Sequence, residues 1–320
     1  MVKKAKRPTA SNVLKLKLPA TSANLGPAFD AAGLALDMFL TLEARPATEF
    51  SIQAAGLDAG ICGKVENHLM FTTYREVLEA EGKTVQPLAL RIENEIPIGK
   101  GCGSSAAARL AGIAMAVHFG KLRWSDDRIV GEASRREHHP DNAAACWMGG
   151  LAVARMASEY EAQVAVIQTK QKWPLLIAIP EEPLSTEAAR KVLPQHYSRA
   201  DAITNIRNSM LLLSAFTQQR TDLLSAALHD RMHEPYRSVL CPLLPALKEL
   251  AGKSGVLGAV LSGAGPSVLV FVHPKANIKK AKAAAESQLR AKGLSAELKL
   301  TQIGLVGAAQ SGNWKRRVKR

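Results

Sequence analysis

The chain has 320 residues, of which 47% are hydrophobic, and this predicts one large or two modest globular domains. No apolar stretch is long enough to cross a membrane, and the basic first residues lack the apolar core of a signal peptide. The four cysteines are scattered without a CxxC pair, which fits neither a disulfide scaffold nor a zinc site. We therefore expect a cytoplasmic protein without a membrane partner.

The net charge of +14 at pH 7 is concentrated at the two ends of the chain. Nine of these charges lie within Lys3–Arg7 and Lys315–Arg320, so the rest of the chain carries about +5. We interpret residues 1–11 and 307–320 as basic tails. With only seven Phe and four Tyr, and no interleaving of aromatic with basic residues, the sequence favours no specific nucleic-acid partner.

The first half of the chain alternates strand and helix signals. Apolar residues at every second position indicate half-buried strands, and longer periodic segments indicate helices. The predicted strands cover residues 14–18, 40–43, 88–93, 151–154 and 164–167. The predicted helices cover residues 67–81, 104–119 and 125–137. Strands that precede and flank helices without a regular alternation predict an α+β fold.

A second region begins near Lys172, with an apolar run that Pro180 ends. Its predicted helices lie near 185–193, 199–229, 243–253 and 275–292, and its strands near 256–261, 267–272 and 296–303. This order predicts helices packed against an antiparallel sheet. We therefore divide the chain into domains of residues 12–170 and 171–306.

The segment Ile96–Ala108 runs from a strand-like stretch through a glycine turn into an alanine-rich helix. Glycines let backbone N–H groups approach an anion, and a helix N-terminus offers unpaired donors with a partial positive charge. The hydroxyls of Ser104 and Ser105 can reach a phosphate or its metal. The segment therefore has the chemistry of a phosphate-binding site.

Other interpretations of this turn remain open at this point. Gly101–Ala106 also satisfies the loose dinucleotide fingerprint, but Trp124–Val130 reads as a helix start where that fold needs a strand ending in an acidic residue. The Gly-Lys pairs of the chain lack either the upstream glycine or the hydroxyl of a GxxxxGK[ST] loop. A structural glycine turn before a helix is a further alternative.

Four separated segments together narrow the choice. Leu18–Asp30, the glycine loop, Glu137–Ala143 and Leu261–Ser267 resemble the GHMP small-molecule kinases in order and spacing, over most of residues 13–306. The Thr-Ser-Ala-Asn-Leu-Gly and His-Pro-Asp-Asn versions look like the homoserine kinases of that superfamily. The resemblance implies an N-terminal domain like ribosomal S5 domain 2 and a C-terminal ferredoxin-like sandwich. It also implies phosphorylation of L-homoserine to O-phospho-L-homoserine in threonine biosynthesis, with ATP and Mg²⁺, and allows a homodimer.

The resemblance assigns roles to residues on the ATP side. Ser105 and Glu137 would bind Mg²⁺, with Glu132 as the rival carboxylate, and a helix N-cap is the alternative role of Asn67. The residues implied in ATP binding are Asn67, Pro97, Ile98, Gly99, Lys100, Gly101, Cys102, Gly103, Ser104, Ser105 and Ala106.

The resemblance also assigns the acceptor side, as Asn24, Asp30, His139, Thr186, Arg190 and Arg237. Asp30 would face the substrate ammonium, and the guanidinium groups of Arg190 and Arg237 would hold its carboxylate. Alternatively, Asp30 caps the following turn, and the arginines are ordinary surface residues.

The catalytic residues implied are Ser105, Glu137, Asp141 and Asn142. Because Asn142 stands where other superfamily members have an aspartate base, we expect catalysis by positioning and electrostatics, with Asp141 as the candidate proton acceptor.

Two competing functions remain compatible with the sequence, and the chain departs from the family pattern at Ala28, where glycine is common, and at Cys102. The chain could phosphorylate another small alcohol such as mevalonate, or be a non-catalytic nucleic-acid-binding relative. Cys102 stands where the family has leucine, so it fills apolar space. A sharper hypothesis gives Cys102 thiolate character, because it lies beside Lys100 at a helix N-terminus.

Overall fold

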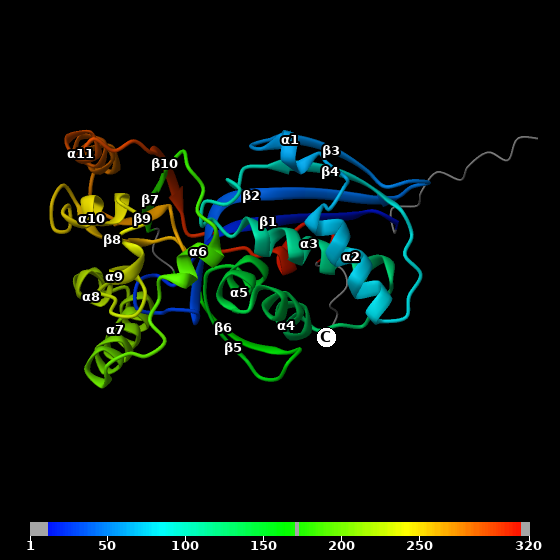
Figure 1. Ribbon diagram of the computed structural model, residues 1–320, viewed down its shortest axis with the longest axis horizontal. Coiled ribbons are helices and arrows are strands. Elements are labelled where there is room, and N and C mark those ends of the chain that lie inside the picture. Colours follow the sequence, from blue (N-terminus) through cyan, green and yellow to red (C-terminus); the bar gives the residue numbers. More distant parts are fainter. Residues whose placement is uncertain (1–11, 170–172, 315–320) are drawn as a thin grey trace, which may run out of the picture.

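The computed structural model describes residues 12–169 and 173–314, and its N-terminal domain is built around two long antiparallel strands (Figure 1). The sheet has the order β3-β4-β2-β5-β6, with β1 paired to β2, and only β3 and β4 are parallel. Its strands are β1 (Leu14–Ala23), β2 (Ala32–Pro46), β3 (Ser51–Gly56), β4 (Leu88–Asn94), β5 (Leu151–Met156) and β6 (Ala162–Ile167).

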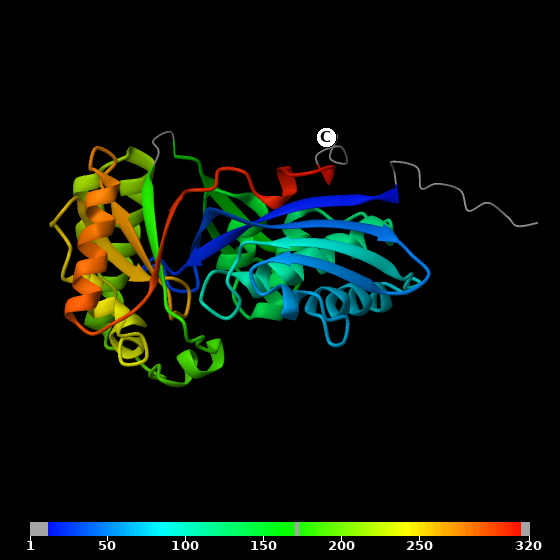
Figure 2. The same ribbon diagram turned by 90° about the horizontal axis from the view of Figure 1, so that it is seen from above.

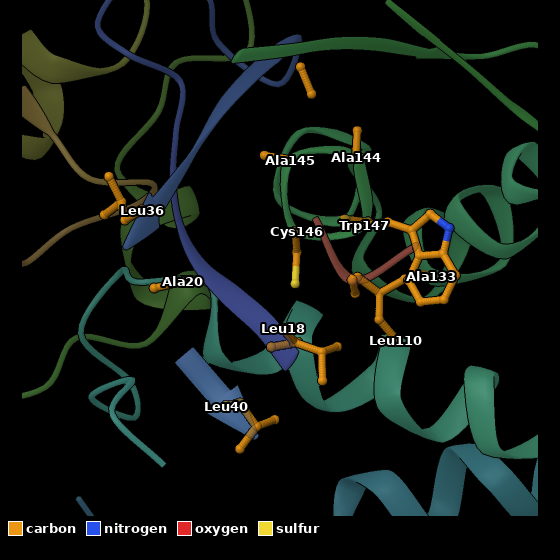
Figure 3. Close-up of a cluster of buried hydrophobic side chains, with 14 of the residues drawn as sticks. Leu18, Ala20, Leu36, Leu40, Leu110, Ala133, Ala144, Ala145, Cys146 and Trp147 are labelled. Carbon is orange, nitrogen blue, oxygen red and sulfur yellow. The ribbon is translucent and has the colours of Figure 1, made fainter. Parts of the chain in front are cut away.

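Helices cover one face of this sheet, as the two perpendicular views agree (Figures 1 and 2). They are α2 (Leu69–Ala80), α3 (Ser104–Phe119), α4 (Asp126–Glu137) and α5 (Asp141–Met148), and a short α1 (Ala59–Cys62) follows β3. Figure 3 shows the packing between them, with Cys146 of α5 and Leu110 of α3 near Leu18 of β1. Alanines let α3 be buried on most sides, and this fixes the position of its first turn.

The C-terminal domain has an antiparallel sheet of the order β10-β7-β9-β8, which is the order expected for a ferredoxin-like sandwich. Its elements are β7 (Pro174–Ile179), α6 (Thr186–Lys191), α7 (Arg199–Gln218), α8 (Thr221–Ala227), α9 (Glu234–Arg237), α10 (Leu243–Lys248), β8 (Val256–Leu261), β9 (Val268–Val272), α11 (Ile278–Ala291) and β10 (Glu297–Gln302).

Helices cover both faces of this second sheet, which explains the continuous apolar runs of β7, β8 and β9. Leu175 and Ile177 of β7 belong to the same buried cluster as Phe216 of α7. Leu176 and Ala178 belong to the cluster of α10 and α11. The first cluster also includes the core of the N-terminal domain, so one apolar cluster spans both domains and the second belongs to the C-terminal domain alone.

The expectation of a single helix over residues 199–229 is wrong. Gln219 has a left-handed backbone, with φ +58°, and it separates α7 from α8. The sequence interpretation also omitted β3, α1, α5 and α9. These elements are short, or carry no clear apolar periodicity, so their pattern is weak.

Residues 307–314, expected to belong to a basic tail, instead pack against β1. The backbone N–H of Lys15 donates to Asn313 Oδ1 at 2.9 Å, and a short 3₁₀ turn (Ala308–Gln310) precedes Trp314. Trp314 is buried, with its ring centroid 5.2 Å from that of Trp147. The basic residues at the end of the sequence led us to assign residues 307–314 to a tail, although this segment includes Trp314, which packs against Trp147. Residues 1–11 and 315–320 lie outside the described residues, as does the expected domain boundary at 170/171.

No helix in the described parts of the chain is long and apolar enough to cross a membrane.

Candidate active site

A cavity of about 520 Å³ lies between the two domains and receives side chains from both. That volume suits a small ligand with several polar anchors. Most of the residues expected in the site line it, namely Asn24, Asp30, Asn67, Ile98, Gly99, Gly101, Gly103, Ser104, Ser105, Ala106, Glu137, His139, Asp141, Asn142, Thr186, Arg190 and Arg237. Pro97, Lys100 and Cys102 are not among the lining residues.

The glycine loop is held between two other motifs. Gly101 and Gly103 both have φ +73°, and a Cβ at Gly103 would lie 1.9 Å from Thr21 Oγ1. A Cβ at Gly101 would lie 2.3 Å from the carbonyl oxygen of Ser262, whose hydroxyl donates to the Gly101 carbonyl at 2.7 Å. Only glycine tolerates both the backbone angle and the close approach. The loop geometry thus depends on segments remote in the sequence.

The N-terminus of α3 opens onto the cavity. Its N-cap is Gly103, so no side chain caps the helix, and the first intrahelical bond runs from the Ala107 N–H to the Gly103 carbonyl. The N–H groups of residues 104–106 therefore have no intrahelical acceptor. Together with the helix dipole, they form a site for an anion.

Glu137 lies at the end of α4, directly opposite the start of α3. Its Oε1 accepts hydrogen bonds from the Ser105 hydroxyl at 2.7 Å and from Arg109 Nε at 2.5 Å. The rival Glu132 is buried elsewhere and binds Arg135 and Arg136. Burial alone would raise the pKa of Glu132, but hydrogen bonds and charge from these two arginines outweigh burial and lower it. Of the two candidate carboxylates, only Glu137 lies beside Ser105.

His139, Asp141 and Asn142 form a hydrogen-bonded group at the start of α5. Asp141 Oδ1 accepts from the Asn142 N–H at 2.6 Å and lies 2.7 Å from His139 Nδ1. Burial would lower the pKa of His139, but the hydrogen bond and charge of Asp141, with Asp30 and Glu137 nearby, raise it. The hydroxyl of Thr21 donates to Asn142 Oδ1 at 2.6 Å, which fixes the amide orientation.

Asp30 and Arg190 pair with each other across the domain boundary. Arg190 Nη2 donates to both carboxylate oxygens of Asp30, at 2.9 and 3.1 Å, and about a third of each side chain is exposed. This pairing disagrees with the alternative that Asp30 only caps a turn. Asn24 fixes the approach of Asp30: its Oδ1 accepts the Asp30 N–H, and its Nδ2 donates to the Gly263 carbonyl.

Arg237 differs from Arg190 because it is buried and held by neutral acceptors. Its Nε donates to the Ala189 carbonyl at 3.0 Å, and only 1% of the residue is exposed. Burial, together with the charge of Arg190, lowers the pKa of Arg237. In the described part of the chain, no carboxylate lies within ion-pair distance of this guanidinium.

Two expectations on the ATP side change. The hypothesis of a reactive Cys102 is wrong, because the thiol is buried and burial raises its pKa to about 12. The cysteine fills apolar space, as leucine would. Asn67 is not the N-cap of α2, since that position is His68; instead Asn67 has φ +53° and lines the cavity.

Sequence reasoning omitted several residues that support the site. Thr21 fixes Asn142, Arg109 contacts Glu137, and the ring of Phe29 lies beneath both Arg190 and Arg237, at 5.8 and 5.2 Å from their guanidinium carbons. The spacing of Arg109, one helical turn after Ser105, was an available signal. Nothing in the sequence indicates Phe29 as a shared platform.

The unpaired N–H groups at the start of α3 suit a phosphate, and the charged side chains that line the same cavity suit a small polar acceptor. Such a cavity indicates a small-molecule kinase. The family models described as GHMP kinases N terminal domain and GHMP kinases C terminal match residues 68–150 and 212–291. The chain belongs to the GHMP kinases.

Individual relatives agree with this assignment. The chain is 44% identical to a homoserine kinase of Solibacter usitatus, over 80% of the chain and 84% of that relative. It is 35% identical to a homoserine kinase of a Synechococcus strain, over 92% of the chain and 96% of that relative. The crystal structure of a homoserine kinase from Cytophaga hutchinsonii has the same fold, with a TM-score of 0.80 at 24% identity, over 95% of this chain and 99% of that one.

Proposed function

We propose that the protein transfers the γ-phosphoryl group of ATP to the side-chain hydroxyl of L-homoserine, yielding O-phospho-L-homoserine in the threonine pathway. The observation that carries the acceptor is the set of charges in the cavity, where Asp30, Arg190 and Arg237 offer both signs to one small molecule. An amino acid presents an ammonium and a carboxylate that such a set can bind at once. The similar homoserine kinases support this acceptor. We propose that the reaction takes place in the cytoplasm.

The phosphates of ATP would lie at the start of α3. The unpaired N–H groups of residues 104–106 and the glycine turn supply hydrogen bonds without requiring a charged side chain. Asn67, which also lines the cavity, would face the base. Because the loop is clamped by Thr21 and Ser262, its donors are already oriented before the nucleotide binds.

The residues at the loop fit Mg²⁺, which binds oxygen ligands. The Ser105 hydroxyl and the Glu137 carboxylate, 2.7 Å apart, would hold the ion next to the phosphates. When bound, Mg²⁺ supplies neutralisation of the phosphate charge. Arg109 contacts the same carboxylate and compensates its charge in the free protein.

On the acceptor side, binding requires the Asp30–Arg190 pair to be shared with the substrate. The ammonium would bind Asp30 beside Asp141, and the carboxylate would bind Arg190 and Arg237. This arrangement would direct the substrate hydroxyl toward the start of α3. Asp30 and Asp141 bring two carboxylate oxygens within 4.8 Å of each other, a spacing that suits a cationic group.

Phosphoryl transfer then depends mainly on alignment and charge stabilisation. Asp141 remains the candidate proton acceptor, and its Oδ1 already accepts hydrogen bonds from His139 and Asn142 in the free protein. An Asp141→Asn variant with undiminished kcat excludes Asp141 from that role.

The direct test is an assay of ADP release with Mg-ATP and L-homoserine, with the product identified by mass spectrometry. We expect homoserine-dependent ADP release and an acceptor 80 Da heavier. Absence of turnover with homoserine contradicts the proposal. Turnover with mevalonate instead would assign another alcohol, and the absence of any ATP turnover would favour a non-catalytic relative.

A further inference from the structure

His233 lies immediately before α9, is completely buried and contacts Arg237, which lines the cavity. Its ring stacks on Phe29, with centroids 5.1 Å apart and planes inclined by 22°. Both ring nitrogens have partners. Nε2 lies 2.8 Å from the Gly26 carbonyl oxygen, and Nδ1 lies 3.2 Å from Arg237 Nη1. The imidazole therefore joins the first motif of the N-terminal domain to an arginine of the C-terminal domain.

These partners define the protonation of the ring. A guanidinium can only donate, so Nδ1 must accept; a carbonyl can only accept, so Nε2 must carry the hydrogen. His233 is thus a neutral imidazole with one tautomer. Burial, with Arg237 close by, agrees with this by lowering the pKa of His233 to about 4, despite the opposing charge of Asp230.

The carboxylate nearest to His233 does not neutralise Arg237. Asp230 Oδ2 is 3.8 Å from His233 Nε2, and the Asp230 carboxylate accepts the backbone N–H groups of Met232, His233 and Glu234. Asp230 therefore holds the turn that leads into α9. Among the described residues Arg237 therefore has no carboxylate partner, whereas Arg190 is paired with Asp30.

From this geometry we infer that His233 is a positioning residue for the binding of homoserine. The neutral imidazole accepts a hydrogen bond from Arg237 and so orients its guanidinium, and the charge of the guanidinium stays available for the substrate carboxylate. This inference rests on the proposed function. A carboxylate at position 233 would orient the arginine equally well but would compete with the substrate for its charge. A neutral acceptor with a fixed tautomer orients Arg237 without that competition.

The test uses an isosteric pair of variants in the full-length protein, His233→Asn and His233→Asp. In both, the atom bonded to Cγ replaces Nδ1, but only aspartate brings a negative charge. We expect His233→Asn to stay within about threefold of the wild-type KM for homoserine, and His233→Asp to raise that KM at least about tenfold. The KM for ATP should stay unchanged in both, with folding checked by thermal melting and circular dichroism.

The outcomes separate this inference from the proposed function. A wild-type enzyme that does not turn over homoserine defeats the proposed function itself. With an active wild type, an equal KM for homoserine in the two variants overturns the positioning role and leaves His233 as a packing residue. If His233→Asp does not fold, His233→Leu and His233→Gln replace the pair: leucine, which lacks an acceptor, should raise the KM at least about fivefold over glutamine, and equality again overturns the inference.

Discussion

The two halves of the cavity are built on different principles. The donor half consists of backbone N–H groups at the start of α3, and glycines with positive φ and close contacts to Thr21 and Ser262 fix their positions. The acceptor half consists of charged side chains from distant segments, and two of them, Asp30 and Arg190, already pair with each other. The donor half therefore has its hydrogen-bond donors already in position, whereas on the proposed function the acceptor half would exchange an internal ion pair for contacts with substrate.

The largest effect should come from the carboxylate beside the donor half. We expect Glu137→Gln to lower kcat about 100- to 1000-fold, because it removes the charged partner of Ser105 at the phosphates. The measurement is kcat as a function of Mg²⁺ concentration. Glu132→Gln is the matched control. It should lower the melting temperature, since Arg135 loses its carboxylate partner and Arg136 keeps only Glu76, but it should leave the Mg²⁺ dependence unchanged. If instead Glu132→Gln changed the Mg²⁺ dependence and Glu137→Gln did not, Glu132 would be the metal ligand.

The acceptor half should respond through KM. We expect Arg190→Gln to raise the KM for homoserine about 10- to 100-fold with the KM for ATP unchanged, because charge-assisted hydrogen bonds contribute about 1.5–3 kcal/mol each. Steady-state kinetics in both substrates measure this. Arg199→Gln, at the exposed start of α7, is the control and should leave both constants unchanged. If Arg190→Gln raised the KM for ATP as much as the KM for homoserine, the two halves of the cavity would not bind separate substrates.

The buried His233 should make stability depend on pH. Its pKa is about 4 in the folded state and about 6.5 when unfolded, so the unfolded chain takes up the proton first as pH falls. Its contribution is present above pH 6.5 and lost toward pH 4, about 2 kcal/mol of it by pH 5. The melting temperature of the wild type should therefore approach that of His233→Asn as pH falls from 7.5 to 5. A constant difference between the two proteins contradicts this.

The smallest effect concerns the side chain of Cys102 in the glycine loop. Cys102 is buried with a raised pKa, so iodoacetamide at pH 8 should leave it unmodified in the native protein, with or without Mg-ATP. Peptide mass spectrometry checks this, with the urea-unfolded protein as the positive control. If native Cys102 is labelled, and Mg-ATP prevents the labelling, then the thiol is accessible and this prediction is wrong.

Local features of the fold could be predicted from the sequence, whereas contacts between distant segments could not. The helix after the glycine loop has the predicted bounds, 104–119, because glycines and alanines specify a turn and a helix locally. The partner of Arg190 lies 160 residues away, so local spacing could not predict that this arginine pairs with Asp30. Local spacing also gave Cys102 a basic neighbour, but the packing that buries the thiol comes from other segments.

Helix geometry alone could have shown that Glu132 and Glu137 do not both belong to the metal site. Five residues on a helix turn by roughly 140°, so the two carboxylates cannot face the same site. Which of them faces Ser105 depends on how α4 packs against α3, and that is a tertiary property. His233 was undetectable in the same way, since its partner Gly26 belongs to the other domain.

The central claim is that the acceptor half recognises both ends of an amino acid, and the most direct measurement is kcat/KM for L-homoserine against 4-hydroxybutyrate, which lacks the ammonium. We predict that homoserine is preferred by about 10- to 150-fold, the size expected for one lost charge-assisted interaction, and that mevalonate supports no measurable ADP release. Equal kcat/KM for the two hydroxy acids, or turnover of mevalonate above that of homoserine, would contradict the account.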